Sequence, residues 1–392
     1  MQGEGRRGML LYLALALLAA AWLAAYLVLR LASRRTGKKP ENITIYPLFL
    51  MLRTKRVVEP LDKIANLNPR LWDVVARIAI VTGFGMAAFA VYILVNNLST
   101  YLFRPETVGV QNIVIPLIIG VTIRLEHIPY LLLAFGIVLI THEGMHGIIA
   151  RREGIPLKSA GIFLLFILPG GFVEPEEKAF REAEPGKRIR VAAVGSFANL
   201  VVGVFVIFLM LGLFLPSEGG LYIVETSEDA RIPANEVIVS IDGAPVNRFT
   251  LTRSITLGEK MVVKGLRSEY VFEIREQFVG REVPIGVLVS SLGAKQVDYF
   301  YPLRIGSLDP SAVYTLYKTL NWIQLVSLGV AVFNMLPIYM LDGSIMLASL
   351  LEKITKDQRK IRITLSTVAV LCVTLLLANI MFTYSTFGFF QL

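Results

Sequence analysis

His142, Glu143 and His146 form the sequence HEGMH, which holds two of the three histidines in the chain. On a helix, residues four apart lie on one face, so both imidazoles can reach a single metal ion. A glutamate between them can polarise a metal-bound water without being a ligand itself. The pattern therefore predicts a hydrolytic metal site. The alternative is a buried polar pair held by neighbouring helices.

The segment around this motif is apolar. Residues 128–140 carry almost no polar side chain, and Arg151 and Arg152 follow the motif. Ionisable groups at membrane depth are costly and are usually kept for function. We therefore expect the motif to lie inside a membrane-spanning helix.

Long apolar stretches recur along the chain. Of its 392 residues, 55% are hydrophobic, and a helix needs about 20 apolar residues to cross a bilayer. The first stretch is long and is followed by a run of basic residues, so we interpret it as a retained anchor and not as a cleaved signal peptide. We expect a polytopic α-helical membrane protein with about six transmembrane helices, at about 9–29, 74–98, 128–149, 191–215, 312–333 and 363–386.

The basic residues indicate the orientation of these helices. Residues 30–77 contain eleven Lys or Arg against four Asp or Glu, and 151–190 and 353–362 are also rich in basic residues. These loops should therefore face the cytoplasm. Residues 216–305 carry ten basic and twelve acidic residues and should lie outside. Because the net charge of +9 gathers beside the spans, it indicates a lipid bilayer and no nucleic acid as partner.

Residues 216–305 have the character of a small soluble domain. Asp242-Gly243 predicts a tight turn inside it. The sequence 231–246 resembles the core of a PDZ domain, although Asn235-Glu236 replaces the usual Gly-Asp. The alternative is an unrelated small β-rich insert. The β-branched residues predict short strands at 221–225, 236–242, 270–274 and 284–290.

Two apolar pieces, 107–127 and 158–175, are interrupted by proline and glycine and are too broken for confident spans. They are either connecting segments or re-entrant pieces that line a site. A strand edge next to a metal could hold an extended peptide by backbone hydrogen bonds.

A catalytic zinc usually has three protein ligands and an open fourth position, so a third residue must join His142 and His146. Asp342 is the candidate, because an apolar span breaks at Asn334 and Pro337 and then delivers this carboxylate. The alternative is a plain turn at a helix end. At 1.5 Å per helical residue, His142 lies roughly 13 Å from the basic end of its segment and Asp342 about 16 Å from the basic end of its own. The two groups therefore reach similar depth from the same face.

Asn199 ends the sequence Gly195-Ser-Phe-Ala-Asn199 and lies at a similar depth, roughly 13 Å from Arg190. It could form an interhelical hydrogen bond, with Gly195 allowing close helix packing. It could also donate to the oxyanion that forms when water attacks a peptide carbonyl. The spacing alone does not decide between these two roles.

The order HExxH, GxxxN, PDZ-like insert and NxxPxxxxDG resembles the site-2 protease family of intramembrane zinc metalloproteases. The resemblance covers roughly residues 128–355 and is closest to archaeal and bacterial members with one PDZ-like domain. It implies His142, His146 and Asp342 as zinc ligands, Glu143 as general base and Asn199 as a contact to the transition state. One departure is Ser196, where many members carry proline after the glycine.

The expected protein is thus a zinc endopeptidase of the cell membrane that cuts transmembrane segments of single-span proteins, with its site toward the cytoplasm. The PDZ-like α+β domain would lie outside, as a size filter or docking module. The alternative function is a metal transporter or metal sensor that uses the same three ligands. Predicted domains are an N-terminal anchor region (1–106), a catalytic core in two parts (107–215 and 306–392) and the outer domain (216–305).

Overall fold

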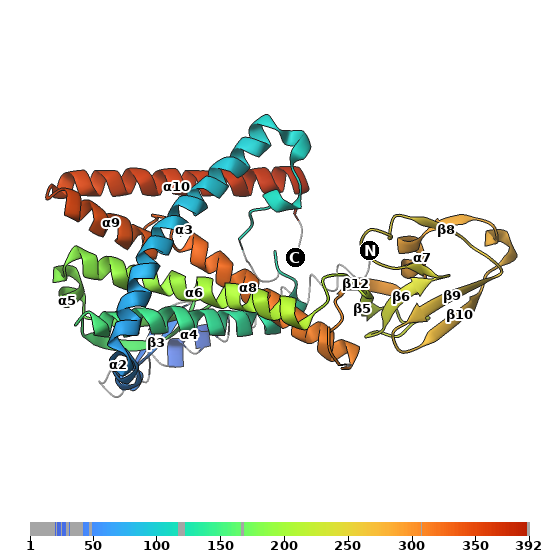
Figure 1. Ribbon diagram of the computed structural model, residues 1–392, viewed down its shortest axis with the longest axis horizontal. Helices are drawn as coiled ribbons and strands as arrows, with labels where there is room; N and C mark the ends of the chain where they lie inside the picture. The colour runs from blue at the N-terminus through green and yellow to red at the C-terminus, as the bar shows by residue number, and fades with distance from the viewer. Residues whose placement is uncertain are drawn as a thin grey trace. The chain divides into compact units, whose positions relative to one another are not determined.

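The computed structural model describes residues 42–389, apart from 47–48, 117–121, 166–167 and 307, together with a few residues between 20 and 31 (Figure 1). The predicted span at 9–29 lies mostly outside the described residues. The chain divides into two compact units. One comprises residues 1–203 and 325–392, and the other comprises Val204–Gln324.

Five helices of the described chain are long and apolar enough to cross a membrane. They match five of the six expected spans. Proline stands at the first position of several of them, where its missing N–H costs nothing, and Asn68 accepts a hydrogen bond from Leu71 N at the start of α3. The five are α3 (Pro69–Phe103), α4 (Ile128–Arg152), α6 (Pro185–Leu213), α8 (Pro310–Phe333) and α10 (Gln358–Phe387).

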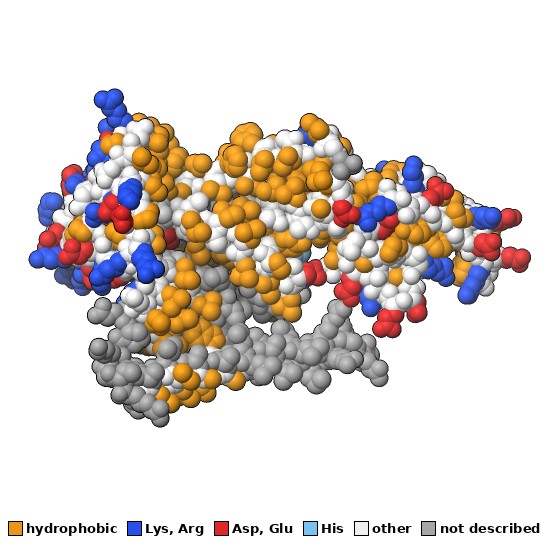
Figure 2. Space-filling model, turned by 90° about the horizontal axis from the view of Figure 1, so that it is seen from below, with side chains coloured by type: hydrophobic (Ala, Val, Ile, Leu, Met, Phe, Trp, Pro, Cys, Tyr) orange, Lys and Arg blue, Asp and Glu red, His pale blue; other side chains and the backbone are white. Residues whose placement is uncertain are grey.

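Large apolar side chains cover the outside of these helices. Val81 on α3, Ile140 on α4 and Phe208 on α6 are 74%, 75% and 68% exposed, respectively. Figure 2 shows hydrophobic side chains over the middle of the helical part, with charged side chains gathered at one of its ends. Exposed apolar surface of this extent is typical of contact with lipid. The chain is therefore a multi-pass membrane protein.

Ion pairs join the basic ends of the helices in the first unit. Arg151 on α4 pairs with Asp62 on α2 (Val58–Leu67). Arg188 on α6 pairs with Glu352 on α9 (Asp342–Ile354). Arg190 on α6 also pairs with Glu153, directly after α4, so these pairs bring the charged ends of α4, α6 and α9 together. Residues a similar number of turns from those ends therefore lie at similar distances from the charged end.

A four-stranded sheet accompanies the helices of the first unit, in the order β1-β2-β3-β4. The segment 158–175 forms most of the antiparallel hairpin of β3 and β4, with Gly161 opposite Phe172. The other two strands come from the loop before α3 and were not predicted from the sequence. The strands are β1 (Ile43–Tyr46), β2 (Phe49–Thr54), β3 (Leu157–Leu165) and β4 (Leu168–Pro175).

Short helices complete the first unit. In the interrupted segment 107–127, the described residues form 3-10 turns. These turns are η1 (Pro105–Thr107), η2 (Val110–Asn112) and η3 (Leu125–His127), and α5 (Glu177–Glu182) follows β4.

The second unit contains a β-rich domain between α6 and α8. Its main sheet has the order β10-β9-β6-β5-β12, with β7 paired to β6, while β8 pairs with β11. Branched aliphatic side chains such as Ile223, Ile238 and Val263 are fully buried in its core. Asp242 (φ 49°) and Gly243 (φ 78°) form the predicted tight turn, which joins β6 to β7. The elements are β5 (Gly220–Thr226), β6 (Val237–Ile241), β7 (Ala244–Pro245), β8 (Ser254–Thr256), β9 (Lys260–Gly265), β10 (Glu269–Glu273), η4 (Glu276–Phe278), β11 (Glu282–Pro284), α7 (Ile285–Ser291) and β12 (Ala294–Phe300).

Three of the four strands predicted in this domain are confirmed, as β5, β6 and β10. The predicted strand at 284–290 is wrong, because these residues form most of the helix α7. Ile285, Leu288 and Val289 are buried there at the i, i+3, i+4 spacing of a helix face. A short apolar run of this kind does not distinguish strand from helix by periodicity alone.

Aromatic pairs attach the domain to the first turns of α8 within the second unit. Tyr222 of β5 stacks on Tyr314 with ring centroids 4.1 Å apart, and Tyr301 stacks on Tyr317 at 4.4 Å. Lys318 forms an ion pair with Asp298 of β12. The unit Val204–Gln324 therefore contains the predicted domain 216–305 together with the adjoining ends of α6 and α8.

Candidate metal centre

The HEGMH motif lies in the second half of α4. His142 is buried, with 6% of its surface exposed, and its ring lies 4.6 Å from that of His146 in an edge-to-face arrangement. The expected helical spacing is therefore confirmed, and both imidazoles project from one face of α4.

Asp342 is the first residue of α9, after the loop that follows α8. The loop folds back on itself, since Gly343 N donates to Asn334 O at 3.0 Å. A Cβ on Gly343 would lie 2.0 Å from the carbonyl oxygen of Met335. Only glycine fits so close to another backbone. The close packing of this loop therefore requires glycine at position 343, next to the carboxylate of Asp342.

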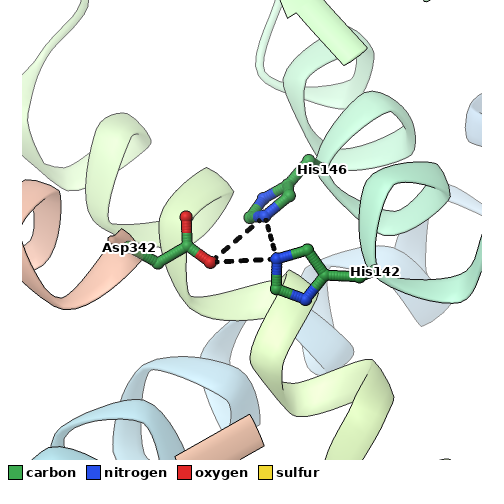
Figure 3. Close-up of side chains that lie close together, drawn as sticks. All are labelled: His142, His146 and Asp342. Atoms are coloured by element: carbon green, nitrogen blue, oxygen red, sulfur yellow. Dashed lines mark hydrogen bonds and ion pairs between the residues drawn. The ribbon is translucent and has the colours of Figure 1, made fainter. Parts of the chain in front are cut away.

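The three predicted ligands converge (Figure 3). Asp342 Oδ2 lies 3.2 Å from His142 Nε2 and 3.3 Å from His146 Nε2, and the two nitrogens are 3.1 Å apart. A tetrahedral ion with bonds of about 2.0–2.1 Å requires ligand atoms about 3.3 Å apart. Two imidazoles and one carboxylate are also a donor set that divalent transition metals favour. The three residues therefore fit a metal ion with an open fourth position.

Glu143 lies beside this group without belonging to it. Its Oε2 accepts a hydrogen bond from Val173 N on β4 at 3.0 Å. Gly171 lets the strand approach, since a Cβ there would lie 3.3 Å from Glu143 Cγ. Strand β4 thus fixes one oxygen of the carboxylate.

Asn199 is fully buried on α6 and reaches the same cluster. Its Nδ2 lies 3.0 Å from His142 Nδ1, the ring nitrogen that does not point toward Asp342. Its Oδ1 lies 3.2 Å from Thr141 Oγ1, and these two amide positions exchange when the carboxamide is turned by half a turn. The structure therefore brings Asn199 into contact with a predicted metal ligand. Its expected contact to the transition state stays a prediction.

Asn334 is a further polar residue beside Asp342 and His142, and this position was not predicted from the sequence. Its Nδ2 donates to Asp342 Oδ2 at 2.8 Å and lies 3.0 Å from His142 Nε2. The signal was present in the sequence, because Asn334 opens the motif that delivers Asp342. Seven residues, 335–341, separate them, and such a loop has no periodicity from which to predict the contact.

Glu174, next to Val173, is a second carboxylate near the motif. It accepts hydrogen bonds from Ser159 Oγ at 2.7 Å and Lys158 Nζ at 2.9 Å. Partial burial acts to raise its pKa, but the bonds from Ser159 and Lys158 prevail and hold the pKa of Glu174 below its ordinary value. Among the described residues, the converging ligand group consists of His142, His146 and Asp342.

Comparison with known proteins gives concordant results. Residues 130–378 match the model of a family described as peptidase family M50. The chain is 27% identical to an uncharacterized protein of Methanocaldococcus jannaschii over 311 residues, which cover 76% of each chain. It is 26% identical to a membrane-bound transcription factor site-2 protease homolog of Arabidopsis thaliana over 207 residues, which cover 47% of this chain and 40% of the plant protein.

Proposed function

The chain belongs to peptidase family M50, and on that premise we propose that it is a zinc endopeptidase that hydrolyses peptide bonds within or near transmembrane segments of other membrane proteins. One observation carries the proposal. His142, His146 and Asp342 converge at ligand distances, from helices of a multi-pass membrane protein, and Glu143 follows His142 directly on α4.

Each polar residue has a distinct role in this proposal. His142, His146 and Asp342 would hold zinc, which when bound would supply a Lewis acid for the water and the peptide carbonyl. Glu143 accepts the proton of the attacking water and passes it to the leaving amine. Because Val173 N–H holds Oε2 of Glu143, the other carboxylate oxygen is left for the proton.

The position of the site supports entry of water from the basic side. His142 lies nine residues from Arg151 on one continuous helix, roughly 13 Å along its axis. Asp342 lies eleven residues from Lys353 on α9, about 16 Å. With the basic loops in the cytoplasm, the site of this cell-membrane protein lies toward the cytoplasmic face and the β-rich domain lies outside.

Labelling of single cysteines tests this orientation. In a Cys372→Ser background, cysteines at the exposed positions Lys178 and Lys356 should react with a membrane-impermeant maleimide only from the cytoplasmic side. A cysteine at Lys260, exposed in the β-rich domain, should react only from outside. The reverse pattern would invalidate the charge-bias argument and place the site near the outer face.

The substrate must be extended at the cleaved bond, because a helix keeps its amides in backbone hydrogen bonds. Strand β4 is an end strand of the described sheet and carries the backbone N–H that binds Glu143. We therefore place the extended substrate segment along β4, where strand pairing would hold it beside the base. Glycine in the substrate span should favour cleavage, since glycine weakens helices.

The outer domain is the proposed filter. A PDZ-like domain inserted between α6 and α8 would admit single-span substrates whose bulky ectodomains have already been removed, as in regulated intramembrane proteolysis. Metal transport remains the competing interpretation of the ligand set, and the peptidase family match does not favour it.

Cleavage in reconstituted vesicles tests the function. The full-length protein is combined with single-span reporters that differ only in one Gly-Gly pair replaced by Leu-Leu within the span. We expect products cut within the span, found by mass spectrometry, and faster cleavage of the glycine reporter. A chelator should stop the reaction and added Zn²⁺ should restore it. Cleavage that is confined to soluble loops, or that persists in chelator, would contradict the proposal.

A further inference from the structure

One face of α6 lies against both histidines. Val191, Gly195 and Asn199 follow at intervals of four residues, so they share that face. His146 Nδ1 lies 2.6 Å from the carbonyl oxygen of Val191, and His142 Nδ1 lies 3.0 Å from the Asn199 carboxamide. Helices α4 and α6 therefore run antiparallel here, with His146 beside Val191 and His142 beside Asn199.

The metal-facing nitrogens of both histidines are Nε2, as their distances from Asp342 show. A neutral imidazole that offers Nε2 to a metal carries its hydrogen on Nδ1. Each Nδ1 then needs an acceptor. For His146 the acceptor is the backbone carbonyl of Val191, which has a second lone pair beyond its bond within the helix.

Asn199 supplies the acceptor for His142 through its amide orientation. The oxygen and nitrogen of a carboxamide occupy almost the same positions after a half-turn of the group. With Oδ1 toward His142, it accepts the Nδ1 hydrogen, and Nδ2 donates to Thr141 Oγ1. Thr141 can accept because its own hydroxyl donates to the backbone oxygen of Ile137 at 2.9 Å. The His142 Nδ1 hydrogen, the Asn199 oxygen and the Thr141 hydroxyl then each have a partner.

Gly195 makes room for this arrangement. A Cβ on Gly195 would lie 2.3 Å from His146 Nε2 and 2.8 Å from His142 Cε1. Both rings therefore lie against the bare backbone of α6. Any side chain at position 195 would push the ligand atoms away from Asp342.

We propose that this face of α6 fixes which nitrogen of each histidine is presented to the metal, with Asn199 as a positioning residue for His142. The inference rests on the proposed zinc site. It gives Asn199 a role different from the expected oxyanion donor, because the carboxamide acts through a ligand and not on the substrate. Outer partners of this kind are typically worth 10–100-fold in metal affinity.

Two substitutions of Asn199 separate the roles. Asn199→Leu keeps the branched side-chain shape and removes the acceptor, so Zn²⁺ affinity should fall about 10–100-fold. Asn199→Asp keeps an oxygen for His142 Nδ1–H, so Zn²⁺ affinity should stay close to that of the wild type. Affinity is measured on the purified full-length protein by competition with a chromophoric chelator. The absorption spectrum of bound Co²⁺ reports the geometry independently of catalysis.

The glycine gives a second, steric test. Gly195→Ala should weaken Zn²⁺ binding and change the Co²⁺ spectrum. Gly212→Ala is the matched control on the same helix, since a Cβ there meets no atom within 4 Å. It should leave both measurements unchanged.

The outcomes distinguish the inference from the function on which it rests. If the wild-type protein binds neither Zn²⁺ nor Co²⁺, both the positioning role and the proposed peptidase function are wrong. If the wild type binds zinc and Asn199→Leu binds it equally well, the positioning role is wrong and the peptidase proposal stands. If Asn199→Asp then retains zinc but loses cleavage, the expected oxyanion donor is the better account, because a carboxylate cannot donate.

Discussion

Replacing Glu143 with glutamine is expected to abolish peptide hydrolysis while leaving the metal in place. Glutamine keeps an oxygen that accepts the hydrogen bond from Val173 N–H, so strand β4 should stay where it is. It removes the proton acceptor, and general-base catalysis contributes typically 10²–10⁴-fold. The measurements are kcat in the reconstituted assay and zinc content by elemental analysis.

Glu174→Gln is the matched control for this prediction. Glu174 is the neighbouring carboxylate, held by Ser159 and Lys158 and outside the ligand group. Its substitution should leave kcat within the scatter of the wild type. If Glu143→Gln cleaves at a rate comparable to the wild type, the base is another group and the role assigned to Glu143 is wrong.

Asp342→Ala is expected to remove zinc and activity together. The change leaves two histidines where a catalytic zinc usually has three protein ligands. Asn334 also loses its carboxylate partner at 2.8 Å. We expect the bound zinc per protein to fall toward zero after dialysis against a weak chelator, with cleavage below detection.

Asp357→Ala separates loss of a ligand from loss of a helix-terminal aspartate. Asp357 caps α10 by accepting from Arg359 N at 3.0 Å and lies outside the ligand group. Its removal should cost about 1 kcal/mol of stability and leave zinc content unchanged. An Asp342→Ala protein with full zinc occupancy would show that the third ligand is a different residue.

The convergence of His142, His146 and Asp342 was predictable from the sequence because the patterns that indicate it are local. His142 and His146 share one helix face at a fixed spacing, and Asp342 follows a break in an apolar span. The distances counted along the chain from the basic residues apply because the counted stretches are helical in α4, α6 and α9; the membrane depth stays a prediction. The outer partners of the ligands were harder to find. The Val191 carbonyl carries no residue-type signal, and the role of Gly195 depends on how closely two helices pack.

Non-local strand pairing accounts for most of what was missed in the fold. Strands β1 and β2 lie about a hundred residues before β3 in sequence, and their short apolar runs sit in a basic loop. Their pairing depends on contacts across that distance, which local patterns do not contain. The helix α7 was mistaken for a strand because its valines and isoleucine suit either structure. The domain boundaries and the likeness of the outer domain to PDZ stay predictions.

The insertion of the β-rich domain between α6 and α8 also sets the interval between the synthesis of the two histidines and the synthesis of Asp342. The two histidines leave the ribosome early, and Asp342 follows after roughly 200 further residues, or about 10–40 s at typical synthesis rates of 5–20 residues per second. Throughout that interval the nascent chain has only two of its three ligands, while its own helices enter the bilayer. If the three side chains hold zinc as proposed, the growing polypeptide gains hydrolytic competence only after Asp342 has been synthesised. Neighbouring nascent helices are then spared during this interval.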